Sequence, residues 1–174
     1  MRKAYLASDD SALLRRALGS YSGRACLEIG AGNGGNLIDL KKRFSRALGT
    51  DVVRPGLDDW KGAGVDYVLA DGASCLKDEC FDLVAFNPPY LPLEVAEDVA
   101  VEGGKELEVP MKFLREALRT VKRTGRVILL LNDQAPIGEL EAICTQRGFN
   151  LRKVLSQRLF FEELAVYEAS ADRA

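Results

Sequence analysis

The sequence predicts an α/β fold in which helices cover both faces of a seven-stranded, mostly parallel sheet that ends in an antiparallel hairpin. Three observations lead to this prediction. Short apolar runs rich in valine, isoleucine and leucine alternate with longer segments of helical period, which is typical of a parallel sheet buried between helices. A glycine-rich turn follows the first apolar run. The last two strand-like runs are joined by a connection too short for a helix, so we expect them to pair antiparallel.

Each predicted element follows from this alternation. The candidate helices, in which apolar residues recur every three or four positions, are Asp10–Gly19, Gly35–Phe44, Val109–Lys122 and Ile137–Arg147. The candidate strands before the hairpin are Ala25–Ile29, Ala47–Thr50, Val65–Leu69, Phe81–Phe86 and Val127–Leu131. Gly148 closes the last helix as a C-cap. The hairpin consists of Asn150–Ser156 and Leu159–Glu168.

Length and composition limit what the chain can be. With 174 residues, of which 47% are hydrophobic, we expect one domain, in which segment 1–22 covers the binding site of a core that spans 23–174. The 24 basic and 26 acidic residues nearly cancel, which favours neither a polyanionic partner nor an anionic membrane. No apolar run approaches the roughly 20 residues that span a bilayer, and no signal peptide is evident, so we expect a cytoplasmic protein. Four cysteines without Cys-x-x-Cys spacing and no histidine argue against a metal site.

The glycine-rich turn at 27–35 reads Leu-Glu-Ile-Gly-Ala-Gly-Asn-Gly-Gly. Gly30, Gly32 and Gly35 have the G-x-G-x-x-G spacing that lets a backbone approach a nucleotide and directs a helix N-terminus at it. A glycine turn with a purely structural role is the alternative. In the cofactor interpretation, the loop residues that bind are Gly30, Ala31, Gly32 and Asn33.

Three acidic residues indicate which cofactor this turn would bind. Glu28 lies two residues before the first glycine, where its carboxylate would repel a pyrophosphate but attract the ammonium and sulfonium groups of S-adenosylmethionine. Asp51, followed by Val52, ends the second strand, where a carboxylate can accept from both ribose hydroxyls. Asp71, followed by Gly72, ends the third strand and would accept from the adenine amino group; an Asx cap on the next turn is the alternative. The sequence therefore predicts S-adenosylmethionine as the cofactor.

The fourth candidate strand runs into Asn87-Pro88-Pro89-Tyr90. We expect this segment at the carboxyl edge of the sheet, beside the first strand and the methyl group of the cofactor. The two prolines have no N–H and a fixed φ, which would hold the segment extended and away from the sheet ladder. A proline-rich strand exit without function is the alternative, but it does not explain the flanking asparagine and tyrosine.

This segment suits methyl transfer to an NH₂ group that is attached to a carbonyl or an aromatic ring. Such a nitrogen is a poor nucleophile because its lone pair is delocalised. The Asn87 side-chain oxygen and the Pro88 carbonyl oxygen would each accept one N–H and direct the nitrogen at a methyl group about 3 Å away. Tyr90 would stack on the planar group and exclude water. Asn87 would thus serve both the cofactor site and catalysis.

With the loop at 28–35 and the segment at 87–90, the chain resembles the HemK family of class I methyltransferases, which use S-adenosylmethionine and have a Rossmann-like fold. It is most similar to the short archaeal and eukaryotic branch of that family. Tyr5–Ser11 resembles the segment Tyr-x-Pro-x-Glu-Asp-Thr of this branch, Glu102–Gly104 its Gly-Gly loop, and Leu159–Leu164 its final-strand motif. The resemblance implies methylation of the N5 amide nitrogen of the glutamine in the Gly-Gly-Gln loop of class 1 peptide-release factors.

The resemblance also implies roles for the N-terminal segment. Ser11 would approach the methionine carboxylate of the cofactor, with Asp9 and Asp10 lining the same mouth; a helix N-cap is the alternative. Ala7 stands where the branch usually has proline, Asp9 replaces glutamate, and a glycine expected near Leu107 is missing. These departures concern the substrate mouth and leave the cofactor core unaffected.

Members of this branch commonly work as heterodimers with a small zinc-binding activator protein, which docks on the sheet edge near the third strand. Val65–Leu69 is the exposed edge in the expected strand order, and its apolar residues fall on both faces. The resemblance therefore implies an activator on this edge.

Three other functions compete with glutamine methylation. Enzymes that methylate adenine N6 or other exocyclic amines of nucleic acids share Asn-Pro-Pro-Tyr, but they need additional mass and a basic surface to bind a duplex and flip a base. The nearest basic stripe is interpreted as an ordinary solvated helix face; it comprises Lys112, Arg115, Arg119, Lys122 and Arg126. Lysine methylation requires that the lysine first lose its proton. A non-catalytic scaffold would keep the fold and the cofactor, but Glu28, Asp51 and Asn87 argue against it.

Overall fold

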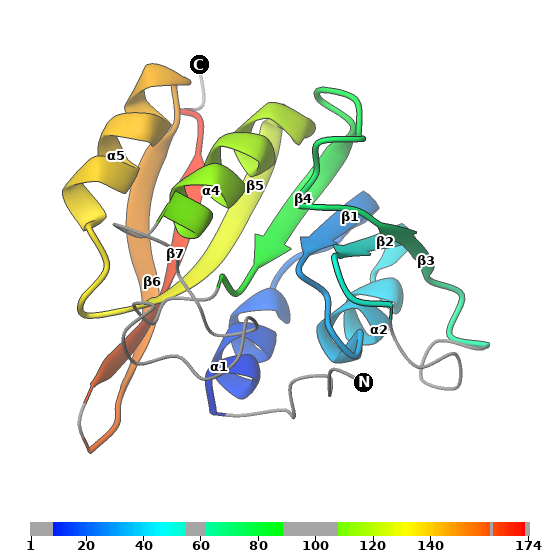
Figure 1. The fold of residues 1–174 in the computed structure, drawn as a ribbon, viewed down its shortest axis with the longest axis horizontal. Helices are drawn as coiled ribbons and strands as arrows, with labels where there is room; N and C mark the ends of the chain where they lie inside the picture. The colour runs from blue at the N-terminus through cyan, green and yellow to red at the C-terminus, as the bar shows by residue number, and fades with distance from the viewer. Residues whose placement is uncertain (1–8, 55–61, 89–107, 161, 173–174) are drawn as a thin grey trace.

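The computed structural model describes residues 9–54, 62–88, 108–160 and 162–172. Its centre is a seven-stranded sheet with the strand order β3-β2-β1-β4-β5-β7-β6 (Figure 1). The strands are β1 (Gly23–Ile29), β2 (Phe44–Asp51), β3 (Asp66–Leu69), β4 (Phe81–Phe86), β5 (Val121–Asn132), β6 (Asn150–Arg158) and β7 (Glu163–Ser170). The helices are α1 (Asp9–Leu18), α2 (Gly35–Lys41), α4 (Glu108–Thr120) and α5 (Ile137–Gln146).

Neighbouring strands from β3 to β5 run parallel, whereas β7 runs antiparallel between β5 and β6. The prediction of a parallel sheet that ends in an antiparallel hairpin is therefore confirmed. The chain passes from β1 outward to β2 and β3, and then crosses to β4 on the other side of β1. Ligands of open α/β sheets bind in the crevice at such a switch point, outside the carboxyl ends of the strands. The strand order therefore directs the search for a site to the ends of β1 and β4.

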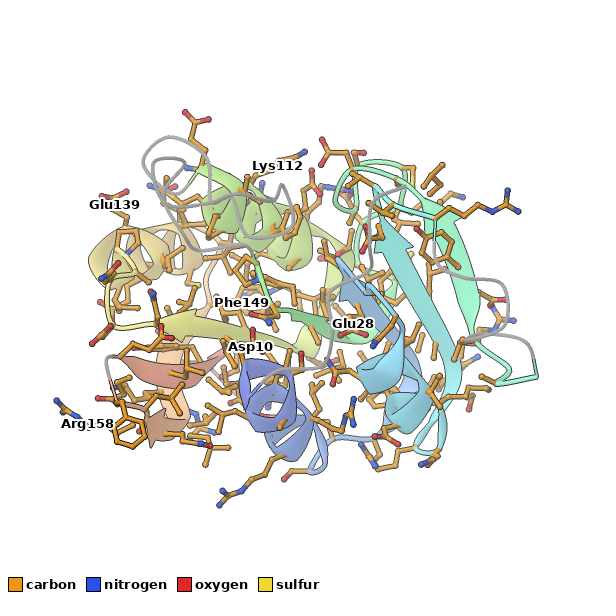
Figure 2. All side chains as sticks on the ribbon, turned by 60° about the horizontal axis from the view of Figure 1, so that its bottom comes forward. Asp10, Glu28, Lys112, Glu139, Phe149 and Arg158 are labelled. Atoms are coloured by element: carbon orange, nitrogen blue, oxygen red, sulfur yellow. The ribbon has the colours of Figure 1, made fainter. Side chains whose placement is uncertain are left out.

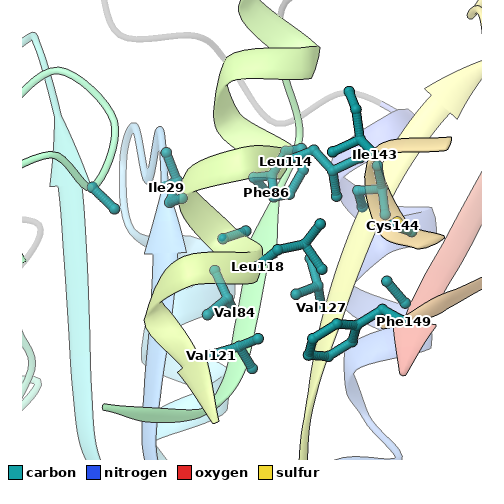
Figure 3. Close-up of a cluster of buried hydrophobic side chains, with 14 of the residues drawn as sticks. Ile29, Val84, Phe86, Leu114, Leu118, Val121, Val127, Ile143, Cys144 and Phe149 are labelled. Atoms are coloured by element: carbon teal, nitrogen blue, oxygen red, sulfur yellow. The ribbon is translucent and has the colours of Figure 1, made fainter. Parts of the chain in front are cut away.

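Helices cover both faces of the sheet, as predicted, with α1 and α2 on one face and α4 and α5 on the other. Side chains alternate along β1, because successive residues of a strand point to opposite faces. Leu27 and Ile29 join the cluster under α4 and α5, whereas Cys26 joins the cluster under α1 and α2. Figure 3 shows the first of these clusters and labels Phe86 within it. The ring of Phe86 lies edge-on to that of Phe113 of α4, with ring centroids 6.1 Å apart. This packing fixes the end of β4 against α4.

Two predicted helices end earlier than expected because the next strand begins inside them. α2 ends at Lys41, and Phe44, predicted as the end of that helix, is the buried first residue of β2. α4 ends at Thr120, and β5 begins at Val121, which pairs with Phe81 before an irregularity shifts the register. The first residue of each strand, Phe44 or Val121, is apolar and also fits the helical period of the preceding helix. The sequence pattern therefore could not locate the boundary between helix and strand.

The C-terminal hairpin also differs at its turn. β7 begins at Glu163 and not at Leu159, because the backbone N–H of Leu159 donates to the Glu162 carbonyl at 2.8 Å and closes the turn. The strand then continues to Ser170, beyond the predicted end at Glu168. The turn lies at the edge where β5 ends, and the hairpin projects past the neighbouring strands (Figure 1).

Helix α1 brings the start of the described chain to the end of β4. Leu13 and Leu14 are buried in the core on the α1 face of the sheet. After the helix, the hydroxyl of Tyr21 donates to Glu168 Oε2 of β7 at 2.6 Å. Because α1 is held at both of these places, its first turn lies beside Asn87. The expected division into segment 1–22 and core 23–174 stays a prediction.

Candidate active site

Three strand ends meet at the carboxyl edge of the sheet. In the parallel register, Ile29 of β1 lies opposite Thr50 of β2 on one side and Phe86 of β4 on the other. Next to these positions in the chain lie three polar residues: before Ile29, after Thr50 and after Phe86 come Glu28, Asp51 and Asn87, respectively. The structure thus brings to one edge three residues that the sequence analysis selected separately.

The loop after β1 turns sharply toward α2. Gly30 and Gly32 have φ values of 69° and 52°, which favour glycine, and the N–H groups of Gly30 and Ala31 both donate to the Thr50 carbonyl, at 2.8 and 3.0 Å. Asn33 Oδ1 accepts from the Gly35 N–H at the start of the helix, at 3.1 Å. A Cβ atom added at Gly32 would meet no other atom within 4 Å, so the loop leaves open space on that side.

Glu28 is a buried carboxylate with one unsatisfied oxygen. Its side chain is only 4% exposed, and Asn36 Nδ2 donates to Oε1 at 2.8 Å. Oε2 is buried and has no hydrogen-bond partner among the described residues. Burial raises the pKa of Glu28 from 4.5 to about 7, against the opposing effects of the Asn36 hydrogen bond and the Arg15 charge. A cationic group next to Oε2 would satisfy both the charge and the missing hydrogen bond.

Asp51 connects the end of β2 to the glycine loop. Its Oδ2 accepts from the Gly32 N–H and its Oδ1 from the Val53 N–H, each at 2.9 Å. The side chain of Val52, next in the chain, is 58% exposed. Asp51 therefore holds the loop in place through one oxygen, and its remaining lone pairs stay available for a hydroxyl group.

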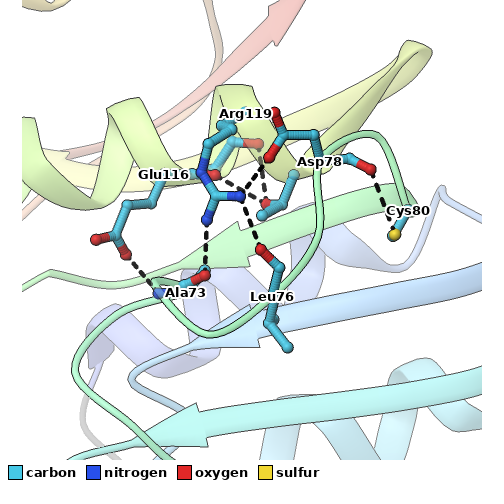
Figure 4. A network of polar contacts seen from close by, with 8 residues as sticks. Ala73, Leu76, Asp78, Cys80, Glu116 and Arg119 are labelled. Atoms are coloured by element: carbon cyan, nitrogen blue, oxygen red, sulfur yellow. Dashed lines mark hydrogen bonds and ion pairs between the residues drawn. The ribbon is translucent and has the colours of Figure 1, made fainter.

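Asp71 follows the end of β3 on the β2 side: the backbone N–H of Ala70, the residue before it, donates to the Asp51 carbonyl at 2.9 Å. Asp71 lies two positions past the strand, and its carboxylate pairs with Lys112 of α4. The turn after Gly72, which has a φ of 65°, is held mainly from α4: Glu116 accepts from the Ala73 N–H, and Arg119 donates to backbone carbonyls of the same turn (Figure 4). The Asx cap, which was the alternative role for Asp71, is therefore not what organises this turn.

Asn87 stands one residue beyond β4, and its side chain bonds to α1. Asn87 Nδ2 donates to Asp10 Oδ2 at 2.9 Å, and Asp10 Oδ1 accepts from the Ser11 N–H at 2.6 Å. Asn87 Oδ1 is buried and has no partner among the described residues.

Figure 2 labels Asp10 in the first turn of α1 and Glu28 on β1 next to α2. Pro88 is buried, whereas Pro89 and Tyr90 lie outside the described residues.

Unsatisfied polar atoms gather at this edge. The buried side-chain oxygens that lack a partner within the described part of the chain are Glu28 Oε2, Thr50 Oγ1 and Asn87 Oδ1. Buried polar groups in native proteins are almost always hydrogen-bonded, so an edge with three exceptions, on β1, on β2 and just after β4, has the properties of a binding site.

The sequence analysis did not identify the residues that form hydrogen bonds to the predicted site residues and fix their side chains. Asn36 binds Glu28 from the first turn of α2, and Arg15 Nε of α1 donates in turn to Asn36 Oδ1 at 3.3 Å. Thr50 was also missed, although the sequence gave a signal: Thr50 is a polar residue at the end of the buried strand predicted over Ala47–Thr50. For Asn36 and Arg15 no spacing signal exists, because the contact depends on how two helices pack.

Comparisons with known proteins identify the family. The family described as "Methyltransferase domain" matches residues 27–129. A "Putative protein N5-glutamine methyltransferase" of Methanocaldococcus jannaschii is 30% identical over 185 aligned positions, which cover 96% of this chain and 91% of the relative.

Solved structures show the same fold. A chain of the E. cuniculi Mtq2–Trm112 complex, described as responsible for methylation of the eRF1 translation termination factor, matches with a TM-score of 0.80 and 25% identity, over 97% of this chain and 99% of that chain. The YcgJ protein of Bacillus subtilis matches with a TM-score of 0.69 and 11% identity, over 95% and 99% of the two chains. No helix in the described ranges is long and apolar enough to cross a membrane. The domain match and the nearly full-length alignment with the M. jannaschii relative, at 30% identity, show that this chain belongs to the S-adenosylmethionine-dependent methyltransferases, and among them to the protein N5-glutamine methyltransferase family.

Proposed function

We propose that this protein transfers a methyl group from S-adenosylmethionine to the side-chain amide nitrogen of the glutamine in the Gly-Gly-Gln loop of a class 1 peptide-release factor. The observation that carries the proposal concerns two buried oxygens at the same edge, Asn87 Oδ1 and Glu28 Oε2, which have no hydrogen-bond partner among the described residues. One oxygen would accept from an NH₂ group, and the other would accept from a cation. A methyl-transfer site for a neutral amide needs both.

The residues at the edge fit the cofactor. Glu28 Oε2 would accept from the ammonium group, and Asp51 from the ribose hydroxyls. Val52, whose side chain is 58% exposed, would cover the adenine, with Asp71 and Gly72 at its far side. Ser11 would approach the methionine carboxylate. The loop residues that would follow the cofactor backbone are Gly30, Ala31, Gly32 and Asn33. S-adenosylmethionine supplies the methyl group as an electrophile on a sulfonium.

The acceptor amide would be oriented by two oxygens. Asn87 Oδ1 and the Pro88 carbonyl would each accept one N–H of the glutamine, which turns the nitrogen lone pair toward the methyl group. The nitrogen would gain the methyl group while the bond from the methyl carbon to sulfur breaks and its electron pair stays on sulfur. The cationic amide that results is a strong acid and would lose one proton to water, so a strong base is unnecessary. Pro89 would keep the segment extended, and Tyr90 would stack on the amide plane and exclude water.

The same proposal includes a small partner protein. In the E. cuniculi neighbour, the related chain forms a complex with Trm112. Here β3 is the edge strand of the sheet, and Leu69 at its end is 61% exposed. An unpaired strand with an exposed apolar side chain suits the docking of another protein. We infer that a small zinc-binding activator docks on the sheet edge near Val65–Leu69 and that the pair acts in the cytoplasm.

The basic stripe on and after α4 gives little support to nucleic acid as the substrate. Most of its members are engaged within the protein: Lys112 pairs with Asp71, Arg119 with Asp78 at 2.5 Å, Lys122 with Asp82 at 2.5 Å and Arg126 with Glu168 at 3.9 Å. Cations that are already paired offer less to a phosphate backbone. Lysine methylation is also disfavoured, because two oxygen acceptors stabilise a protonated amine, which has no lone pair for the transfer.

The test is methyl transfer from labelled S-adenosylmethionine to a purified class 1 release factor, with and without the activator. We expect label on the wild-type factor and none on a factor whose Gly-Gly-Gln glutamine is alanine. Asn87→Ala should reduce the rate by about 100-fold to 1,000-fold, the usual loss for one preorganised polar group, while the cofactor still binds. Label on tRNA, DNA or a lysine, but never on the glutamine, would refute the release-factor proposal.

A further inference from the structure

Asp10 and Asn87 form a side-chain hydrogen bond that joins the start of α1 to the end of β4, 77 residues apart in sequence. Asn87 Nδ2 donates to Asp10 Oδ2 at 2.9 Å. Asp10 is only 4% exposed, and its other oxygen accepts from the Ser11 N–H. The carboxylate is therefore fixed by its own helix before it contacts Asn87.

The chemistry of this pair determines which way the Asn87 amide points. The two ends of an asparagine amide have nearly the same size and shape, so packing alone does not distinguish the oxygen from the nitrogen. An ionised carboxylate can only accept hydrogen bonds, so the NH₂ end of Asn87 must face Asp10. The carbonyl end then faces the other way, where Oδ1 is buried without a partner in the described ranges.

We propose that Asp10 is the positioning residue of the methyl-transfer site: its carboxylate locks the Asn87 amide with Oδ1 toward the acceptor nitrogen. This inference rests on the proposed function. A flipped amide would present two N–H donors to the NH₂ group of the substrate, and the two donors would repel each other. The bond to a charged acceptor also polarises the amide and strengthens Oδ1 as an acceptor.

The decisive variant is Asp10→Asn, which keeps the shape of the side chain. An asparagine at position 10 can donate as well as accept, so it no longer selects one orientation of Asn87. With the release factor as substrate, we expect kcat to fall by about 100-fold, as for other small misplacements of a reacting group. The dissociation constant of S-adenosylmethionine should stay within about twofold, because Asp10 acts through Asn87.

The chain offers a matched control at the other edge of the sheet. Asn150 Nδ2 donates to Asp172 Oδ1 at 2.5 Å in an exposed asparagine–carboxylate pair. Asp172→Asn makes the same chemical change and should leave kcat unaltered. Asp10→Glu restores a carboxylate and should recover part of the activity that Asp10→Asn loses. Asp10→Ala should resemble Asp10→Asn.

A second readout does not depend on the substrate. In ¹⁵N-labelled protein, the Asn87 side-chain NH₂ signals, assigned by their loss in Asn87→Ala, should show one proton shifted downfield and slow to exchange with solvent. Asp10→Asn should remove both properties, whereas Asp172→Asn should keep them. If these signals match those of a solvated amide in the wild type, the locked orientation is wrong even if the enzyme is active.

The outcomes separate this inference from the proposed function. Wild-type kcat in Asp10→Asn overturns the positioning role, and so does a loss confined to cofactor affinity. If the wild-type protein methylates no release factor, the proposed function fails, while the NMR comparison still decides whether Asp10 locks Asn87.

Discussion

Asn36 of α2 donates a 2.8 Å hydrogen bond to one oxygen of Glu28 and leaves the other oxygen, buried at the end of β1, without a partner in the described part of the chain. A half-satisfied buried carboxylate is unfavourable in the free protein. A bound cation would offset this cost. In the proposed function, the ammonium group of the cofactor would be that cation, and its binding would compensate for the free energy lost by burying the Glu28 carboxylate. Two predictions about pH follow from this relationship.

The affinity for S-adenosylmethionine should increase with pH around neutrality. Burial raises the pKa of Glu28 to about 7, so the carboxylate is mostly protonated at pH 6 in the free protein, whereas the cofactor ammonium favours the ionised form. We expect binding to be roughly fivefold to tenfold tighter at pH 7.5 than at pH 6, measured by isothermal titration calorimetry. Glu28→Gln should bind weakly and without this pH dependence. A wild-type affinity that is flat across this range would contradict the assignment of Glu28 to the ammonium group.

The stability of the free protein should fall as the pH rises from about 4.5 to 7. In the folded state Glu28 holds its proton up to about pH 7, whereas the unfolded chain loses it near 4.5, so the unfolded state binds fewer protons in this window. The contribution is complete below pH 4.5 and lost above 7; at about 1.4 kcal/mol per pKa unit it amounts to about 3 kcal/mol. Glu28→Gln should therefore be more stable than the wild type at pH 8, with a smaller difference at pH 5. Urea unfolding at both pH values tests this, and equal differences at the two would refute it.

The sequence predicted the edge of the sheet where the site lies better than it predicted the contacts inside the site. Parallel strands end at one edge, so Glu28, Asp51 and Asn87 could be brought together from strand order alone. Asp71 was assigned to the cofactor on the same argument, and that role stays a prediction; its carboxylate, two residues past the end of β3, pairs with Lys112 of α4.

The contacts that hold the site depend on the packing of helices, which has no local signature. Asp10 was predicted to line the mouth, but its bond to Asn87 requires that α1 lie across the sheet at one particular rotation. The ends of α2 and α4 were misplaced for a related reason. Phe44 and Val121 fit the helical period, and their use in β2 and β5 is decided by pairing with distant strands.

Removing one hydroxyl from the anchor of α1 should destabilise the fold. Tyr21 donates to Glu168 Oε2 at 2.6 Å, and burial together with the Glu168 carboxylate raises the pKa of Tyr21, which keeps the hydroxyl protonated as a donor. Glu168 is 4% exposed, so Tyr21→Phe removes a hydrogen bond from a buried carboxylate and should cost about 1–3 kcal/mol. Tyr167→Phe, whose hydroxyl has no hydrogen bond to the described residues, should cost less. Thermal unfolding of the two variants gives the comparison, and equal losses would mean that the Tyr21 bond contributes nothing specific.

Two glycine-to-alanine changes should have opposite effects on stability. At Gly72 the backbone φ is 65°, and a Cβ would overlap the Glu116 carboxylate that accepts from the Ala73 N–H, so strain and loss of that bond should together cost at least about 2 kcal/mol. At Gly138, in the first turn of α5, a Cβ would meet nothing within 4 Å, and alanine should gain up to about 1 kcal/mol from its helix propensity. Urea unfolding of both variants at one pH measures the contrast. If Gly72→Ala proves neutral, Glu116 can move away without cost, and the turn after β3 is not held by its contact with α4.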